Sequence, residues 1–187
     1  MIPPASFGGD ERVRLFCALR LPAETVARLV AWQAEALAAG LGVRPVPAEN
    51  LHITLAFLGR RPTTELAAIL GALRKAAAAT SRPRLSLHGY RETRGVGMLT
   101  FDDDAGRAAA LATDLHRRLE QLGVYERERR KWLPHVTVVR FRERPRLRPA
   151  LPELESFAPS DVAAYLSRLR PGGAQYEVLE SMEVGGR

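Results

Sequence analysis

The chain has 187 residues, of which 46% are hydrophobic and 26% charged, a composition typical of a globular protein and not of a disordered one. Its formal net charge of +7 favours a polyanionic partner such as nucleic acid. No segment reaches the roughly 18 uninterrupted apolar residues of a membrane helix, and the N-terminus has no apolar stretch of signal-peptide length. We therefore expect a soluble, cytoplasmic protein, with flexible residues 1–12 followed by a single domain at 13–187.

Strands and helices are expected to alternate in the first half of the chain. Pro22 suits the first turn of a helix because its missing N–H is not needed there. Thr63 is a candidate cap for a second helix. From the spacing of the apolar residues, we expect a strand at 13–19, a helix at 23–39, a strand at 51–58, a helix at 63–79 and a strand at 84–90.

The second half repeats this order loosely. Three consecutive aspartates at 102–104 predict a turn and a negatively charged first helical turn, which the helix dipole favours. Prolines recurring between 145 and 159 predict an irregular connection. The expected elements are a strand at 96–101, a helix at 105–122, a strand at 134–141, and closing strands at 161–169 and 175–184 around a turn at 171–173.

Two tetrapeptides of the same form carry the most information, one in each half: His52-Ile53-Thr54-Leu55 and His135-Val136-Thr137-Val138. Because side chains alternate between the faces of a strand, each histidine shares a face with the threonine two residues later. The apolar residues then share the other face. Two such strands side by side would place two imidazoles and two hydroxyls around one phosphate. One motif in each half also favours a duplicated lobe.

A pair of histidines can divide acid and base catalysis, because imidazole titrates near neutral pH. In hydrolysis of a cyclic phosphodiester, one ring would take a proton from the attacking water. The other would protonate the departing ribose oxygen, each step contributing on the order of 10²–10⁴-fold. Thr54 and Thr137 would donate hydrogen bonds to the non-bridging phosphate oxygens. For the remaining histidines, His88 and His116, we expect a place in the core or on the surface.

Other chemistries have less support in the sequence. A zinc site would need a suitably spaced third ligand, so we expect no metal and no cofactor. Cys17, the single cysteine, lies in a predicted strand and is expected to be a core residue. Arginines crowd both sides of the second motif and would attract an RNA backbone, with a merely solvated surface as the alternative. Candidates for stacking on a base are Phe57, Tyr90 and Trp132.

The chain resembles the two-histidine phosphoesterases, and among them the bacterial RNA 2′,3′-cyclic phosphodiesterases, also called 2′-5′ RNA ligases. The similarity covers residues 13 to 184. Leu133 departs from it, since relatives often carry a polar or histidine residue before the proline of the second motif. Besides the two motifs, the similarity rests on Arg14-Leu15-Phe16, Leu21-Pro22, Glu49-Asn50-Leu51, Arg140, Ser167, Gly173 and Tyr176.

This resemblance implies an α+β fold with two lobes related by a pseudo-twofold axis, an antiparallel sheet in each lobe, helices outside and a central cleft. It implies metal-independent hydrolysis of RNA 2′,3′-cyclic phosphate ends to 2′-phosphomonoesters, in some members with 2′-5′ ligation of tRNA halves without ATP. His52 would protonate the O3′ leaving group and His135 would activate water. Arg44, Arg130 and Arg140 would contact the substrate.

Two other functions stay open at this point. One is a non-catalytic RNA-binding module that keeps the cleft for recognition. The other is the same chemistry on a small cyclic nucleotide, in which case activity would lack the steep salt dependence of extended backbone contact. The partner we expect is RNA that carries a 2′,3′-cyclic phosphate or a 2′-5′ linkage, and we expect no membrane contact and a monomer.

Overall fold

The structure is a computed structural model that describes residues 11–37, 42–171 and 173–185, so most of the terminus expected to be flexible lies outside the described residues. Short 3₁₀ helices lie at Ala48–Asn50, Thr63–Glu65 and Asp104–Gly106. In chain order, the strands and α-helices are β1 (Arg12–Arg20), α1 (Ala23–Ala36), β2 (Val43–Pro45), β3 (His52–Pro62), α2 (Leu66–Ala79), β4 (Leu85–Glu92), β5 (Val96–Asp103), α3 (Arg107–Gln121), β6 (His135–Phe141), β7 (Val162–Arg170) and β8 (Gly173–Met182).

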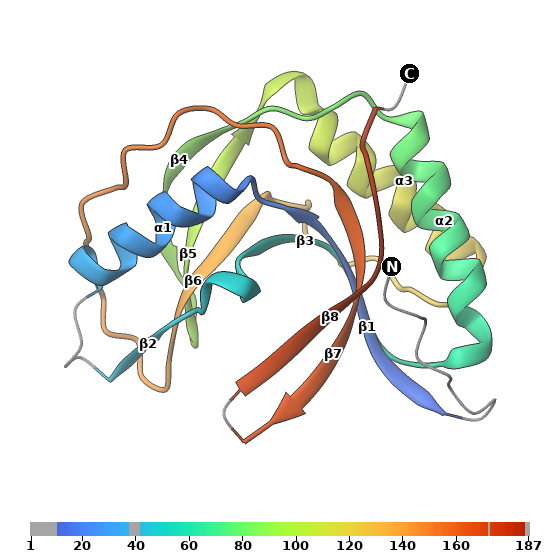
Figure 1. The fold of residues 1–187 in the computed structure, drawn as a ribbon, viewed down its shortest axis with the longest axis horizontal. Coiled ribbons are helices and arrows are strands. Elements are labelled where there is room, and N and C mark those ends of the chain that lie inside the picture. Colours follow the sequence, from blue (N-terminus) through green and yellow to red (C-terminus); the bar gives the residue numbers. More distant parts are fainter. Residues whose placement is uncertain (1–10, 38–41, 172, 186–187) are drawn as a thin grey trace.

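The described strands form one antiparallel sheet in the order β4-β5-β6-β3-β1-β7-β8, with β2 paired to the last residues of β6. Between β3 and β6 the register contains one pair, Ile53 with Val136. The sheet curls, and its two halves diverge from this junction (Figure 1). The antiparallel sheet expected in each lobe therefore takes the form of two halves of one sheet, each carrying one histidine strand.

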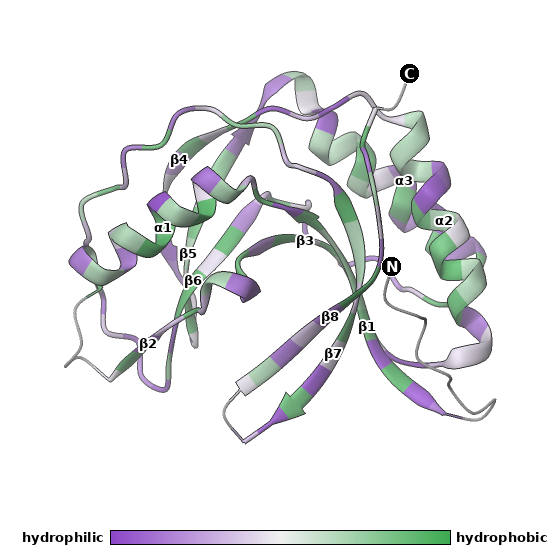
Figure 2. Cartoon of the chain, in the orientation of Figure 1, coloured by the Kyte–Doolittle hydropathy of each residue, from purple (hydrophilic) through white to green (hydrophobic). Residues whose placement is uncertain are grey.

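Helices cover the outside of both halves (Figure 1). α2 and α3 pack against each other and against β3, β5, β7 and β8, whereas α1 lies over the half that contains β6. The buried amide of Gln33 in α1 donates to the main-chain oxygens of Val46 and Val138, which ties this helix to β6. α2 is mostly green in Figure 2, in line with its buried residues Ile69 and Leu73.

Both histidine strands have one apolar and one polar face, as the alternation predicts. Ile53 and Leu55 of β3, and Val136 and Val138 of β6, are buried, while the histidines and threonines between them are partly exposed. Burial of each such apolar side chain stabilises the fold by roughly 1.5–3 kcal/mol. A shift of the strand register by one residue would expose these apolar side chains, so their burial fixes the face on which the histidines lie.

β3 continues to Pro62 instead of ending before Gly59 as the sequence predicts. Gly59 has φ +67° and pairs with Leu15 at an irregularity in the register, so this residue bends the strand and does not end it. The expected cap is also wrong, because Thr63 lies inside a 3₁₀ helix and α2 begins only at Leu66.

α3 begins at Arg107, two residues later than expected, because Ala105 adopts a positive φ that an α-helix does not allow. The acidic turn nevertheless has the predicted role at the start of the helix. The carboxylate of Asp103 accepts hydrogen bonds from the main-chain N–H groups of Ala108 and Ala109 at 3.0 and 2.8 Å. These N–H groups have no partner within the helix.

β2 has no counterpart among the expected elements, because three residues are too few for a periodic pattern. The first helix ends earlier than expected, at Ala36, because Leu37 has a non-helical backbone; the expected end at residue 39 itself lies outside the described residues. The strands expected from residue 161 onwards are confirmed as β7 and β8, and the segment between β6 and β7 is irregular as predicted.

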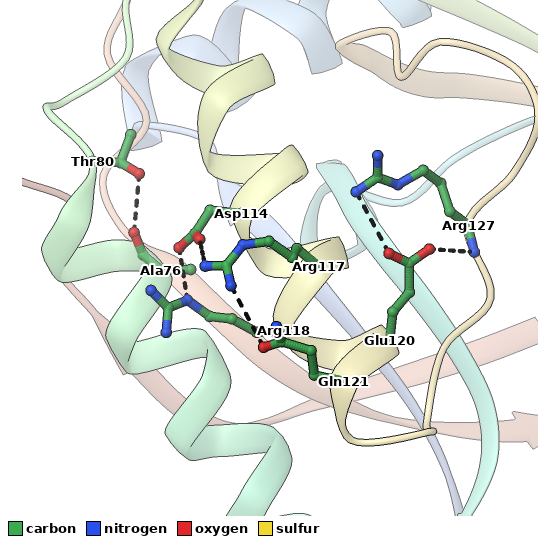
Figure 3. Close-up of polar contacts among 8 residues, drawn as sticks. All are labelled: Ala76, Thr80, Asp114, Arg117, Arg118, Glu120, Gln121 and Arg127. Carbon is green, nitrogen blue, oxygen red and sulfur yellow. Dashed lines mark hydrogen bonds and ion pairs between the residues drawn. The ribbon is translucent and has the colours of Figure 1, made fainter.

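Ion pairs line the exposed side of α3 (Figure 3). Asp114 accepts hydrogen bonds from Arg117 and Arg118 within the helix. Glu120 accepts the main-chain N–H of Arg127 at 3.2 Å and also pairs with its guanidinium. Exposed pairs contribute at most about 1 kcal/mol each, but the last contact fixes the loop that leads from α3 towards β6.

The residues expected to be structural have that role. Cys17 is fully buried in β1, and burial raises the pKa of its thiol to about 12. His116 is buried and donates from Nε2 to the main-chain oxygen of Leu55, while the exposed His88 pairs with Asp102. Among the described residues, no helix combines the length and the apolar character needed to cross a membrane.

Candidate active site

A cleft of about 840 Å³ is lined by residues of β1, β2, β3, β6, β7 and β8. Both motifs reach this cleft, although His52 and His135 lie 83 positions apart in the chain. Six predicted site residues line this one cleft: His52, Thr54, His135, Thr137, Arg44 and Arg140.

The ring of His52 is held at both nitrogens. Its Nδ1 lies 2.8 Å from the main-chain oxygen of Asn50, and its Nε2 lies 3.1 Å from the hydroxyl of Thr54. A carbonyl oxygen can only accept, so Nδ1 carries a proton and, in the neutral ring, Nε2 has the lone pair. The Thr54 hydroxyl then donates to Nε2.

His135 repeats the first of these contacts. Its Nδ1 lies 2.8 Å from the main-chain oxygen of Leu133, again two residues earlier in the chain. The same tautomer follows, with Nε2 as the nitrogen that is free to exchange a proton. The two rings thus have the same orientation relative to their own strands.

Aromatic rings surround His52. The centroid of its ring lies 4.9 Å from that of Phe16 and 5.4 Å from that of Tyr176, which meets it edge-on. The pKa of His52 is lowered to about 4, and burial is the largest cause. The neighbouring His135 and Arg140 contribute to the decrease, and the hydrogen bond to Asn50 opposes it. The imidazole is therefore neutral in the free protein near pH 7.

Trp132, a stacking candidate, has a structural contact instead. Its indole Nε1 donates to the main-chain oxygen of Thr54 at 3.0 Å, which connects the loop before β6 to β3. Tyr90, another candidate, lies outside the cleft and donates its hydroxyl to Glu92. Phe57 is the candidate that lines the cleft, where its side chain is exposed and the guanidinium carbon of Arg14 lies 4.8 Å from its ring centroid.

Arginines give the cleft a positive charge. Arg44 of β2 and Arg140 of β6 are register partners and stand side by side. Arg14 and Arg170 also line the cleft, where the only acidic residue is Glu49, within the described part of the chain. The two motifs do not indicate Arg14 or Arg170 as site residues. For Arg14 a signal exists in the sequence, because it lies two residues before Phe16 in β1 and a period of two places both on one face.

Arg130 is the predicted site residue that the structure does not bring to the cleft. Its side chain is 85% exposed and pairs with Glu128. The loop between α3 and β6 passes outside the cleft, so closeness to His135 in sequence does not become closeness in space. In the described ranges, no three His, Cys, Asp or Glu side chains form a group that could hold a metal ion.

A curled antiparallel sheet that brings two His-x-Thr strands to one cationic cleft defines a two-histidine phosphoesterase. The family model of the 2′-5′ RNA ligase superfamily matches residues 21–169. The chain belongs to this superfamily, which confirms the family that the sequence motifs indicate.

Similar proteins agree with this assignment. The chain is 35% identical, over 93% of its length and 91% of the relative's, to a Thermus thermophilus protein named RNA 2′,3′-cyclic phosphodiesterase. A crystal structure from the same organism has a TM-score of 0.79 at 32% identity, covering 92% of this chain and 98% of that one. Escherichia coli LigT complexed with 3′-AMP has a TM-score of 0.74 at 27% identity, with 93% and 99% covered. The expected α+β fold and an enzyme of this family are thereby confirmed.

Proposed function

We propose that the chain hydrolyses 2′,3′-cyclic phosphate ends of RNA to 2′-phosphomonoesters, with His52 and His135 as an acid–base pair and without a metal ion. The observation that carries this proposal is that two rings in one cleft both direct Nδ1 to a main-chain carbonyl, so that proton exchange falls to Nε2 in both rings. In His52 this nitrogen accepts the Thr54 hydroxyl, a contact that the substrate would replace. The names of the relatives as RNA 2′,3′-cyclic phosphodiesterases support the general activity.

In the proposed reaction, water attacks phosphorus while Nε2 of His135 accepts one of its protons. The bond between phosphorus and O3′ breaks, and His52 gives its Nε2 proton to O3′. The phosphate stays on O2′ as a monoester. Since burial lowers the pKa of His52 to about 4, this ring must take up a proton as the anionic phosphodiester enters, and the negative charge beside it favours that uptake.

The remaining cleft residues stabilise charge in this scheme. The hydroxyls of Thr54 and Thr137 donate to the non-bridging oxygens, on which negative charge grows in the transition state. Arg44 and Arg140 balance the charge of the phosphodiester. A ribose 5′-hydroxyl in place of water would give a 2′-5′ linkage by the same step, and the strained cyclic phosphate makes ATP unnecessary. We therefore include 2′-5′ joining in the proposal.

The test uses an oligonucleotide with a 2′,3′-cyclic phosphate end, in the presence of EDTA. We expect a 2′-phosphate product from the wild type and a loss of at least about 10²-fold in kcat for His52→Ala and for His135→Ala. His88→Ala, a change at an exposed histidine, is the control and should leave kcat unchanged. Retained turnover in either cleft variant, or a 3′-phosphate product, would refute the proposal.

Two alternatives are separated by the same assay. A non-catalytic RNA-binding module would bind the oligonucleotide without turnover. An enzyme for small cyclic nucleotides would act on a 2′,3′-cyclic mononucleotide as well as on the oligonucleotide, with the same weak dependence on salt for both. The RNA enzyme that we propose should prefer the oligonucleotide at low salt and lose this preference as the salt concentration rises.

A further inference from the structure

A second hollow, of about 450 Å³, lies at β4, the terminal strand of the sheet. Four guanidinium groups line it, Arg91 from β4 and Arg144, Arg146 and Arg148 from the segment that follows β6. Glu92 is the only acidic residue in this lining. We call residues 142–150 the arginine strap. In Figure 1 the strap is the orange segment that passes outside α1.

Glu92 holds the strap in place. Its side chain is 3% exposed, and its carboxylate accepts the main-chain N–H groups of Arg146 and Leu147 at 3.0 and 2.7 Å. It also accepts Nε of Arg144 at 3.1 Å and the hydroxyl of Tyr90 at 3.2 Å. With its oxygens occupied in this way, the carboxylate fixes the backbone of the strap but has no capacity left to pair with the other guanidinium groups.

The strap presents its arginines outwards. Arg144, Arg146 and Arg148 are exposed, whereas Pro145 and Leu147 between them are partly buried. Arg146 has φ +56°, a conformation uncommon for residues other than glycine, which the Glu92 contacts maintain. Within the described ranges, neither Arg146 nor Arg148 forms an ion pair with a carboxylate.

Of the described residues, none lines both the hollow and the cleft, and β4 lies two strands from β6 in the sheet. Thr137 of β6 pairs with Met98 of β5, and Met98 pairs with Arg91 of β4, so one row across three strands connects the cleft to the hollow. With strands about 4.8 Å apart, this row is roughly 10 Å long. β6 itself carries Arg140 in the cleft and ends one residue later, where the strap begins.

We propose that the arginine strap and Arg91 bind the phosphate backbone of the RNA body, behind the end that occupies the cleft. This inference rests on the proposed function for the identity of the ligand. Guanidinium groups bind phosphate oxygens with two parallel hydrogen bonds, and such contacts give affinity without sequence specificity. A chain whose end lies in the cleft would reach the strap through phosphates further along its backbone and not through the terminal phosphate.

The test compares wild type with Arg146→Gln/Arg148→Gln on two substrates, a dinucleotide and a 20-nucleotide RNA with the same cyclic phosphate end. A matched control, Arg74→Gln/Arg117→Gln, removes the same charge from the exposed sides of α2 and α3. For the strap variant we expect kcat/KM on the long RNA to fall about threefold or more, and the slope of its logarithm against log salt to become shallower by about one. The dinucleotide and the control should show no change.

Affinity for a 20-nucleotide RNA with an ordinary 3′-hydroxyl is measured in parallel, which separates this inference from the proposed function. If wild type hydrolyses neither substrate but the strap variant still binds this RNA more weakly than the control does, the proposed function fails and the strap inference holds. Equal affinity and equal salt slopes for the strap variant, the control and wild type would overturn the strap inference alone. The charge reversal Arg146→Glu/Arg148→Glu should enlarge every effect of the strap variant.

Discussion

Ile53 pairs with Val136, and this pair joins the two histidine strands. Because the strands are antiparallel, the residue before Ile53 lies opposite the residue after Val136, and the reverse holds on the other side of the pair. His52 therefore lies towards Thr137, and Thr54 lies towards His135. Each imidazole therefore lies near the hydroxyl of the other motif as well as its own. A single anion at the junction can contact both motifs.

The hydroxyls of the motifs are expected to matter for rate and not for folding. Thr54→Val and Thr137→Val remove hydroxyls that line the cleft while keeping the branched shape of the side chain. We expect kcat on a cyclic-phosphate oligonucleotide to fall by about 10²-fold for each, with little change in melting temperature. Thr113→Val, on the exposed surface of α3, is the control. A fall in KM and kcat together would contradict a role specific to the transition state.

The stability of the fold should depend on pH through His52. Its pKa is about 4 in the folded protein and near 6.5 in the unfolded chain, so the unfolded state binds the proton more readily. The stability that the neutral His52 ring contributes is fully present above pH 6.5. As the pH falls towards 4 this stability is lost, and the unfolding free energy decreases by about 3 kcal/mol. Urea denaturation across this range measures it.

His52→Asn supplies the comparison for that measurement. The variant has no titrating group at position 52, so its unfolding free energy should decline less over the same pH interval. Parallel curves for the variant and wild type would mean that this ring does not carry the effect.

Arg140 and Arg130 are expected to differ, although both flank the second motif. Arg140 lines the cleft and its charge lowers the pKa of His52, whereas the exposed Arg130 pairs with Glu128. Arg140→Gln should therefore raise the pKa of His52, as followed by NMR titration of its ring protons, and should raise KM. Arg130→Gln should change neither value. An equal response of the two variants would show that the cleft does not distinguish them.

The buried carboxylate of Glu92 should stabilise the fold without affecting chemistry at the cleft. Glu92→Ala leaves the N–H groups of Arg146 and Leu147 without their acceptor, and we expect a loss of about 1–3 kcal/mol in the unfolding free energy. Glu128→Ala, at an exposed ion pair, should cost less than about 1 kcal/mol. Turnover of a dinucleotide substrate should stay at the wild-type level in both variants.

The elements with a clear hydrophobic period were predictable from sequence, and with them the faces of β3 and β6 that carry the motifs. The local chain distortions were not. Gly59 bends β3 where a glycine after an apolar run normally indicates an end, and Ala105 adopts a positive φ that its residue type does not suggest. β2 is three residues long and is stabilised by pairing with β6, a contact distant in sequence.

The same limit applies to the site. The paired motifs indicate the histidines and threonines because alternation along a strand is a local rule. Arg14 and Arg170 reach the cleft through the order of the strands, whereas the exposed Arg130 pairs with Glu128 and does not line it. Tertiary structure determines which of the many arginines line the cleft, and the net charge of +7 does not distinguish among them.

The atoms that orient both imidazoles belong to the main chain, at Asn50 and Leu133. Every amino acid supplies the same carbonyl oxygen, so no point substitution at either position removes the acceptor. The tautomer of each imidazole is therefore insensitive to the identity of the side chain two positions before it, and the leucine at 133 is as compatible with a protonated Nδ1 as the asparagine at 50.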